Sequence, residues 1–155
     1  PRFRRWIAFH EVTHAAEFGA APWLPAHMES ALETTVDELA AGSLDRDSLG
    51  ELDTTMTAVE GYAELLMDRA FDDEYADLRR KLEARRQGRG PLERLIRRAL
   101  GLSVKRRQYE RGKAFFDAVA DERDIAAAGR VWERPENLPT DEEFDEPSLW
   151  MARVL

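Results

Sequence analysis

The residues best suited to chemistry lie near the start of the sequence, where His10, Glu11 and His14 form the pattern H-E-x-x-H. Residues four apart lie nearly above one another on a helix, so both histidines can offer a ring nitrogen to one metal ion. Glu11 lies near the same face, where its carboxylate can take a proton from a metal-bound water instead of binding the metal. The spacing therefore predicts a zinc site with two protein ligands and a general base.

The pattern fixes only three positions, so it is also compatible with a charged helix that carries two incidental histidines. A buried histidine bonded to the backbone is the alternative for either one singly. The surrounding residues favour the metal. Apolar side chains on most sides of this helix predict that it is buried at the centre of the fold. Buried imidazoles need polar partners, and one shared cation satisfies both of them. These apolar residues are Phe3, Trp6, Ile7, Ala8, Phe9, Val12 and Phe18.

A third ligand is expected from a helix predicted to start at Asp47 or Ser48 and to run to about Phe71, which has the most regular apolar repeat in the chain. Glu60 lies at the edge of the apolar stripe of this helix, and Glu64 and Asp53 lie on the same flank. A carboxylate from this flank can complete a two-histidine site and leave the fourth zinc position for water. We favour Glu60 among the three, and ordinary surface acids are the alternative. The stripe consists of Leu52, Met56, Val59, Ala63, Leu66 and Ala70.

Two further side chains are candidates for the site. His27, near the start of the second predicted helix, could be a third ligand or a transition-state donor, although a lone histidine after a proline is more often exposed. Tyr109 could act as a catalytic residue by donating a hydrogen bond to a developing oxyanion, although an aromatic residue at helical spacing is more often part of a core.

Composition limits the class of protein. A chain of 155 residues with 43% hydrophobic and 35% charged residues suits one globular domain. There is no cysteine, so any zinc must be held by histidine and carboxylate, and a cytoplasmic location is expected. No apolar run reaches membrane-spanning length. The sequence runs almost directly into the first helix without a signal-peptide pattern, so we expect a C-terminal fragment of a longer chain.

The charge is unevenly distributed. Residues 79–113 contain 14 Lys or Arg and three acids, a net of +11, so the rest of the chain must sum to −19 to give the total of −8. A basic segment can bind nucleic acid. Apolar residues recur through it at helical spacing, however, and few aromatic residues interleave. We therefore predict the solvated side of amphipathic helices, without nucleic-acid binding.

The periodicity predicts one all-α domain over residues 1–155, with six or seven helices packed around the first and the third. Metal-site helices occupy residues 1–72, basic amphipathic helices 73–121, and a short helix with an anchored tail 122–155. The sixth helix is expected from about 104 to 120, with Gly112 allowing a close backbone approach.

Smaller signals predict where individual helices begin and end. A second helix from about 26 to 41 should stop at Gly42, a short helix should begin at Asp121, and Thr140 and Glu143 fit a capping box. The second helix should turn one stripe toward the core, namely Met28, Leu32, Val36 and Leu39.

Several segments resemble known metallopeptidases. The run Val59-Glu60-Gly61-Tyr62-Ala63-Glu64 resembles the segment with which gluzincin metallopeptidases present their third, glutamate ligand. More widely, the sequence resembles a family of zincin-like metallohydrolases often labelled as associated with deazaflavin coenzyme biosynthesis. The similar blocks are His10 to Phe18, Pro22 to Leu24, Glu60 to Asp68, Arg107 to Phe115, and Val131 to Thr140.

This resemblance implies a largely helical, zinc-dependent hydrolase with Glu60 as the third ligand, and it supplies no physiological substrate. Typical zincins have an edge strand before the zinc helix that aligns a peptide substrate. That region is absent from this sequence, and any sheet would belong to it.

Together these observations predict zinc-dependent (Zn2+) hydrolysis of a peptide or small amide substrate. His10, His14 and Glu60 would hold the zinc and Glu11 would activate the water. The alternative is a non-enzymatic helical module whose zinc is structural or binds a partner. Glu11 favours the enzyme, since a purely structural site needs no base. No membrane partner is expected.

Overall fold

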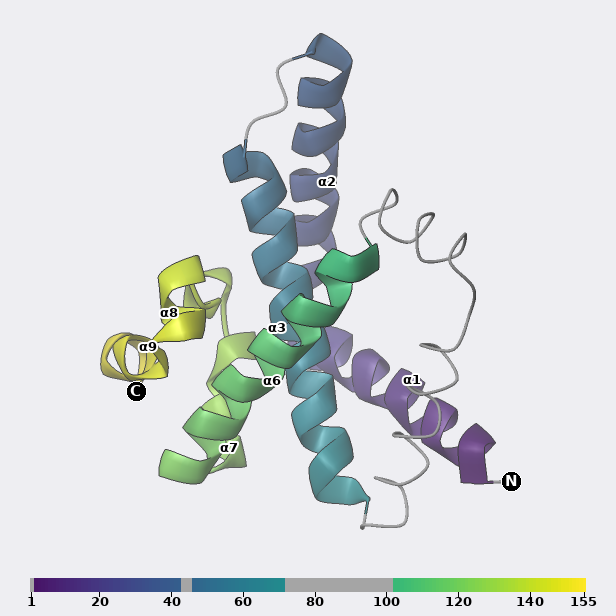
Figure 1. Cartoon of the computed structure of the whole chain (residues 1–155), viewed down its shortest axis with the longest axis vertical. Coiled ribbons are helices and arrows are strands. Elements are labelled where there is room, and N and C mark those ends of the chain that lie inside the picture. The colour runs from purple at the N-terminus through teal and green to yellow at the C-terminus, as the bar shows by residue number, and fades with distance from the viewer. Residues whose placement is uncertain (1, 43–45, 72–101) are drawn as a thin grey trace.

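All regular structure that the computed structural model describes is helical (Figure 1). The described residues are 2–42, 46–71 and 102–155, and for 2, 3, 46–49 and 102–109 only the backbone is described. No strand occurs within these ranges, which confirms the all-α prediction. The fourth and fifth helices, expected between residues 72 and 101, lie outside the described residues. None of the described helices is long and apolar enough to cross a membrane.

Four long helices make up most of the described fold: α1 (Arg2–Ala20), α2 (Leu24–Ala41), α3 (Arg46–Ala70) and α6 (Leu102–Glu122). The end of α2 confirms the predicted stop signal, because Gly42 has a φ of 70°, the left-handed conformation that favours glycine. Its N–H donates to the carbonyls of Glu38 and Leu39. The chain then returns along α3, so that α2 and the start of α3 project together from the other described helices (Figure 1).

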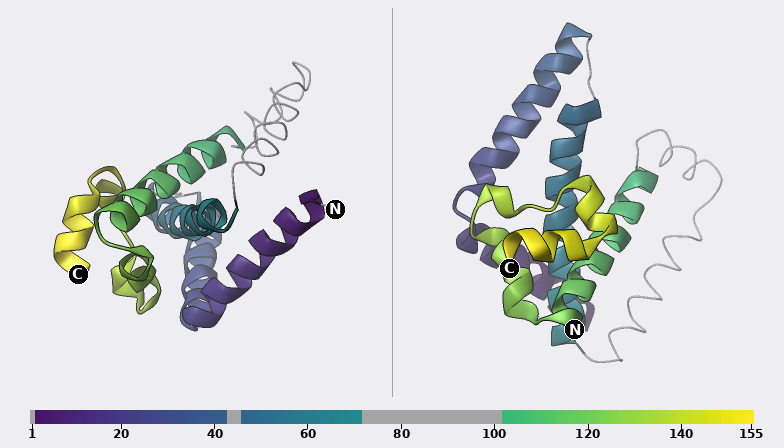
Figure 2. Two further views of the ribbon diagram at one scale, coloured as in Figure 1. Left: turned by 90° about the horizontal axis from the view of Figure 1, so that it is seen from below. Right: turned by 90° about the vertical axis from the view of Figure 1, so that its left-hand side faces the viewer.

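The core lies where α3 crosses α6 (Figure 2). Gly61 and Gly112 meet at this crossing, where a Cβ atom built on Gly61 would lie 2.4 Å from the carbonyl carbon of Gly112. Only glycine lets two helix backbones approach so closely, which confirms the prediction for Gly112. Large aromatic side chains from α6 and the C-terminal segments are buried around the crossing, namely Phe115, Phe116, Trp132, Phe144 and Trp150.

The prediction that the first helix is the buried centre is wrong. Among the side chains of residues 4–20, only Thr13 and Glu17 are buried, and Val12 is 64% exposed. Helix α1 packs mainly on α3 and diverges from the other described helices toward its N-terminus (Figure 2). Because α6 and not α1 is the main partner of α3, the apolar residues on the remaining sides of α1 stay at the surface of the described structure.

The predicted core stripe of α2 is also largely exposed. Leu32, Val36 and Leu39 are 52, 53 and 64% exposed, whereas Leu24 and Ala31 on the neighbouring flank are buried. Helix α2 contacts α3 on this second flank, where His27 lies against Thr55, and the two helices project together from the other described helices (Figure 1). The apolar spacing was therefore correct for a helix, but it did not identify the flank that α3 covers.

The C-terminal segment forms short helices: α7 (Ile125–Gly129), α8 (Asp141–Asp145) and α9 (Pro147–Val154), with 3₁₀ turns η1 (Arg130–Trp132) and η2 (Pro135–Asn137) between α7 and α8. The prediction of a helix start at Asp121 is wrong, because α6 continues to Glu122. The next helix, α7, is capped by Asp124 instead, whose side chain accepts a hydrogen bond from the Ala127 N–H at 2.7 Å. The capping box of Thr140 and Glu143 is confirmed. The fully buried Trp150 confirms an anchored tail.

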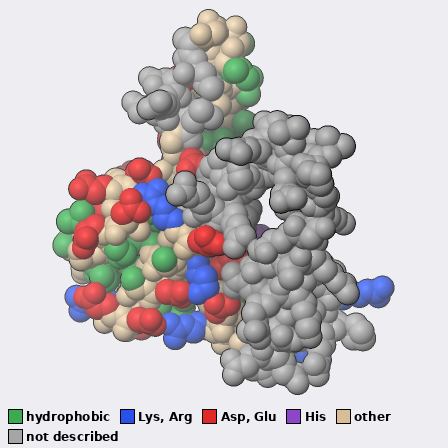
Figure 3. Space-filling view, viewed as in Figure 1, with side chains coloured by type: hydrophobic (Ala, Val, Ile, Leu, Met, Phe, Trp, Pro, Cys, Tyr) green, Lys and Arg blue, Asp and Glu red, His purple; other side chains and the backbone are tan. Residues whose placement is uncertain are grey.

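Ion pairs link the long and short helices. Arg111 of α6 pairs with Asp141 and Asp145 of α8, and Lys113 pairs with Asp68 of α3 at 2.9 Å. Figure 3 shows acidic and basic side chains mixed over the coloured part of this face. The basic side chains of segment 79–113 that the structure describes, Arg111 and Lys113, are thus paired with acids. The rest of that segment's side chains, apart from residues 110–113, lie outside the described residues.

Candidate metal centre

The two histidines of the H-E-x-x-H pattern lie one turn apart on α1 and point toward Glu60 of α3. The Nε2 atoms of His10 and His14 each lie 3.9 Å from Oε2 of Glu60. One ligand atom from each of the three residues lies within 4.8 Å of the other two. Their side chains are 19 or 20% exposed. The structure therefore brings the three predicted ligands together at a half-buried position that solvent can reach.

Among the acids considered for the third position, Glu60 is the one that belongs to this group. Asp53 lies elsewhere on α3, where burial and then the charge of Asp141 raise the pKa of its carboxyl, opposed by Arg111. His27 also lies apart from the group. Its Nε2 is 3.1 Å from Oγ1 of Thr55 and its ring packs edge-on against Trp23, so it is a contact between α2 and α3 and is not exposed as expected.

The two histidines differ in their electrostatic surroundings. Burial, followed by the neighbouring His14, lowers the pKa of His10, while the negative charges of Glu60 and Glu11 oppose that shift. A hydrogen bond with Glu17 is the main cause that raises the pKa of His14. The two rings meet edge to face with their centroids 4.5 Å apart. Two protonated imidazoles at this distance would repel each other, so the arrangement disfavours a positive charge on both rings at once. A shared cation would be bound by the two neutral rings.

Sequence analysis missed Glu17, which is 2% exposed and lies three residues after His14. Its Oε2 atom lies 2.7 Å from Nδ1 of His14. Burial raises the pKa of the Glu17 carboxyl to about 7, although the hydrogen bond with His14 opposes this shift. The i, i+3 spacing from a predicted ligand is a signal that could have identified Glu17, because such residues are neighbours on a helix surface.

Glu11 is exposed and lies outside the group of ligand atoms. Its negative charge nevertheless acts on both rings, because it raises the pKa of His10 and of His14. In each case Glu11 is the smallest of the causes of the pKa shift. A general base must be able to reach the water or substrate from which it takes a proton, and an exposed carboxylate near the ligands meets this requirement. The predicted base is therefore placed beside the predicted ligands.

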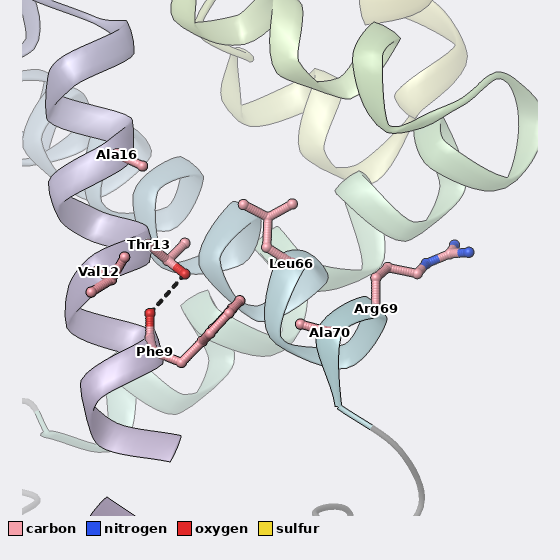
Figure 4. Close-up of a pocket in the computed structure, with 7 residues that line it drawn as sticks. All are labelled: Phe9, Val12, Thr13, Ala16, Leu66, Arg69 and Ala70. Atoms are coloured by element: carbon pink, nitrogen blue, oxygen red, sulfur yellow. Dashed lines mark hydrogen bonds between the residues drawn. The ribbon is translucent and has the colours of Figure 1, made fainter. Parts of the chain in front are cut away.

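Two other features do not add to this centre. The side chain of Tyr109, the predicted oxyanion donor, lies outside the described residues. An apolar hollow lies between α1 and α3 (Figure 4). It lies on a different side of α1 from the proposed ligands, because Val12 and Ala16 in its lining are about 160° from His14 around the helix axis. The whole lining consists of Phe9, Val12, Thr13, Ala16, Leu66, Arg69 and Ala70.

Comparisons with known proteins identify the family of the chain. The sequence matches the zincin-like metallopeptidase family over residues 1–45 and 38–151, and the chain belongs to this family. It is also similar to a putative hydrolase with a novel fold from Chloroflexus aurantiacus, whose crystal structure matches with a TM-score of 0.74 at 36% sequence identity. That match covers 97% of this chain and 51% of the other, so this chain spans about half the length of that protein. No curated protein matches the chain.

Zinc, the metal that this family implies, fits the three side chains. Two imidazole nitrogens and one carboxylate oxygen are a ligand set of catalytic zinc sites, which leave one position for water or substrate. With zinc–ligand distances of about 2.1 Å, tetrahedral ligands stand about 3.4 Å apart. The observed 3.9 Å between each Nε2 and the Glu60 oxygen lies close to this spacing. Small side-chain movements would therefore suffice to bind the ion.

Proposed function

We propose that this chain forms the zinc centre of a hydrolase that cleaves peptide or amide bonds. The observation that supports this most strongly is the distance of 3.9 Å from Oε2 of Glu60 to both histidine Nε2 atoms, across two helices far apart in sequence. The exposed Glu11 beside the rings adds the base that hydrolysis requires. Membership of the zincin-like metallopeptidase family supports the same class of reaction.

In this proposal His10, His14 and Glu60 hold the zinc through two Nε2 atoms and a carboxylate oxygen. A bound zinc ion supplies a Lewis acid that polarises a carbonyl group and lowers the pKa of water. Glu11 takes a proton from the attacking water and afterwards gives it to the leaving amine, so that one carboxyl group acts first as base and then as acid. Because Glu11 is exposed, substrate can reach it without a rearrangement of α1.

Metal analysis tests the ligands directly. We expect one zinc per chain in the metal-loaded protein and none in His14→Ala, measured by inductively coupled plasma spectrometry after dialysis. Glu60→Ala should weaken binding more than Glu64→Ala, since Glu64 lies on the same helix but outside the ligand group. Equal zinc content in wild type and His14→Ala would show that the ligand assignment is wrong. Weaker zinc binding by Glu64→Ala than by Glu60→Ala would assign the third ligand to Glu64, one helical turn further along α3.

A substitution at Glu11 tests the reaction. Glu11→Gln should keep its zinc and lose hydrolysis by about 10²-fold or more, the typical effect of a lost acid–base group. Glu33→Gln is the matched control, because Glu33 is an exposed glutamate on α2 outside the ligand group. Digestion of a peptide library by the full-length protein, with zinc measured in every sample, gives the comparison.

The same experiment distinguishes the enzyme from a non-enzymatic zinc module. Equal cleavage by wild type and Glu11→Gln would exclude Glu11 as the base. Absence of cleavage by the zinc-loaded full-length wild type, for every library used, would favour a zinc ion that is structural or binds a partner.

A further inference from the structure

Glu17 holds the edge of the His14 ring that is turned away from Glu60. Its Oε2 atom lies 2.7 Å from Nδ1 of His14, while Nε2 of the same ring lies 3.9 Å from Oε2 of Glu60. A neutral imidazole has one N–H donor and one acceptor nitrogen. A carboxylate beside Nδ1 accepts a hydrogen bond from an Nδ1–H group, so the proton stays on Nδ1. The lone pair is then on Nε2, the atom that points to the ligand group.

The surroundings of Glu17 make this contact its main polar interaction. The residue is 2% exposed, and its Oε1 atom makes no hydrogen bond within the described residues. Burying a carboxylate with so few partners costs free energy that an apolar residue of similar size would avoid. Packing of α1 on α3 alone therefore does not account for a glutamate at this position.

The other histidine is held differently. The ring of His10 packs against Trp6 at a centroid distance of 5.6 Å, whereas the hydrogen bond of Glu17 is made to His14. Glu17 thus acts on one ligand and not on the other. This difference predicts that a change at Glu17 alters the orientation and tautomer of His14 specifically.

We infer that Glu17 is a positioning residue of the metal centre, which fixes His14 with its proton on Nδ1 and its Nε2 directed to the ion. This inference rests on the proposed zinc site and adds a residue that is not itself a ligand. Carboxylates that accept the second N–H of a ligating histidine commonly change metal affinity or activity by about 10–100-fold when replaced. Glu17 should contribute an effect of this size without contacting the metal.

Zinc affinity measured by competition with a chromophoric chelator tests the inference. Glu17→Gln retains an acceptor but loses the charge, so we expect zinc to bind about tenfold more weakly, and Glu17→Ala removes the acceptor and should approach 100-fold. Thr13→Val is the matched control on the same buried face of α1, since Thr13 is 4% exposed and bonds only to the Phe9 carbonyl among described groups. It should bind zinc like wild type.

A second measurement does not depend on any variant. Nitrogen-15 spectra of the zinc-loaded wild type should show the His14 proton on Nδ1, coupled to a metal-bound Nε2. A proton on Nε2, or wild-type affinity in both folded Glu17 variants, would overturn the inference while leaving the zinc site intact. If the wild type binds no zinc, or binds it as well after His14→Ala, the proposed function itself fails and the role of Glu17 falls with it.

Discussion

Replacement of Gly61 by alanine is the sharpest test of how the fold is held together. At the crossing of α3 and α6, a Cβ atom on Gly61 would lie 2.4, 2.6 and 2.8 Å from the C, Cα and O atoms of Gly112. These are backbone atoms of a neighbouring helix, so no side chain can rotate away to relieve the contact. The two helices would have to separate by about 1 Å to restore ordinary van der Waals distances.

The size of the effect follows from two opposing contributions. Forcing extra atoms into a packed core usually costs about 1–3 kcal/mol, and here separation also loosens the contacts of Phe115 and Phe116. Alanine in place of glycine inside a helix returns about 1 kcal/mol. Because the clash involves backbone on both sides, we expect the upper end of the cost and a net loss of about 2 kcal/mol in the free energy of unfolding.

Gly50→Ala is the matched control, since Gly50 lies on the same helix and its added Cβ would meet nothing within 4 Å. It should gain up to about 1 kcal/mol from helix propensity alone. Urea unfolding of the metal-free proteins, followed by circular dichroism, measures both changes. A Gly61→Ala protein as stable as wild type would refute the close crossing, and a Gly50→Ala protein destabilised as much as Gly61→Ala would show that alanine is harmful for another reason.

Two further predictions concern pH and metal. Burial opposes ionisation of Glu143, but hydrogen bonds from Arg153 and Thr140 outweigh it and lower the pKa of this carboxyl. Wild type should therefore be more stable than Glu143→Gln by about 1 kcal/mol at pH 7. Urea unfolding should show that this difference shrinks as the pH falls below the ordinary pKa of 4.5 and vanishes below the lowered pKa. A constant difference in stability at all pH values would contradict this prediction. Removal of zinc with a chelator should speed amide hydrogen exchange in α1 and leave α6 unchanged. The reason is that an ion held by the proposed ligands would join α1 to α3, whereas α6 packs on α3 through the buried core. Equal acceleration in both helices would contradict this prediction.

Local signals were sufficient to predict the four long helices and several of the helix ends, but not α9 in the tail. The left-handed Gly42 stops α2, and the reciprocal hydrogen bonds of Thr140 and Glu143 start α8, as their positions in the sequence indicate. Such signals depend on residues within one turn of each other, so they require no knowledge of the tertiary structure. The same is true of His10 and His14, whose spacing on one helix already places both rings on one face.

The covered side of each helix was harder to predict, because it depends on which helices become neighbours. Leu32 and Val36 have correct helical spacing and are nevertheless exposed, since α3 covers the adjacent flank of α2. The i, i+3 spacing of His14 and Glu17 could have indicated their contact, but whether two such neighbours touch also depends on their side-chain rotamers. Glu60 could be favoured as a ligand from its position at the edge of a stripe, and the family resemblance indicated the same residue.

The position of Glu60 next to Gly61 connects the metal centre to the core. Consecutive residues on a helix point about 100° apart, so α3 can direct Glu60 toward α1 while Gly61 meets Gly112 on α6. The proposed third ligand is therefore adjacent in sequence to the close crossing of α3 and α6. The two histidines, in contrast, come from a helix with only Thr13 and Glu17 buried among its described side chains. A metal ion at this position would join a carboxylate next to the packed core to two histidines on a helix with few buried side chains. The buried contact between Glu17 and His14 would then help to fix the orientation of one of these histidines.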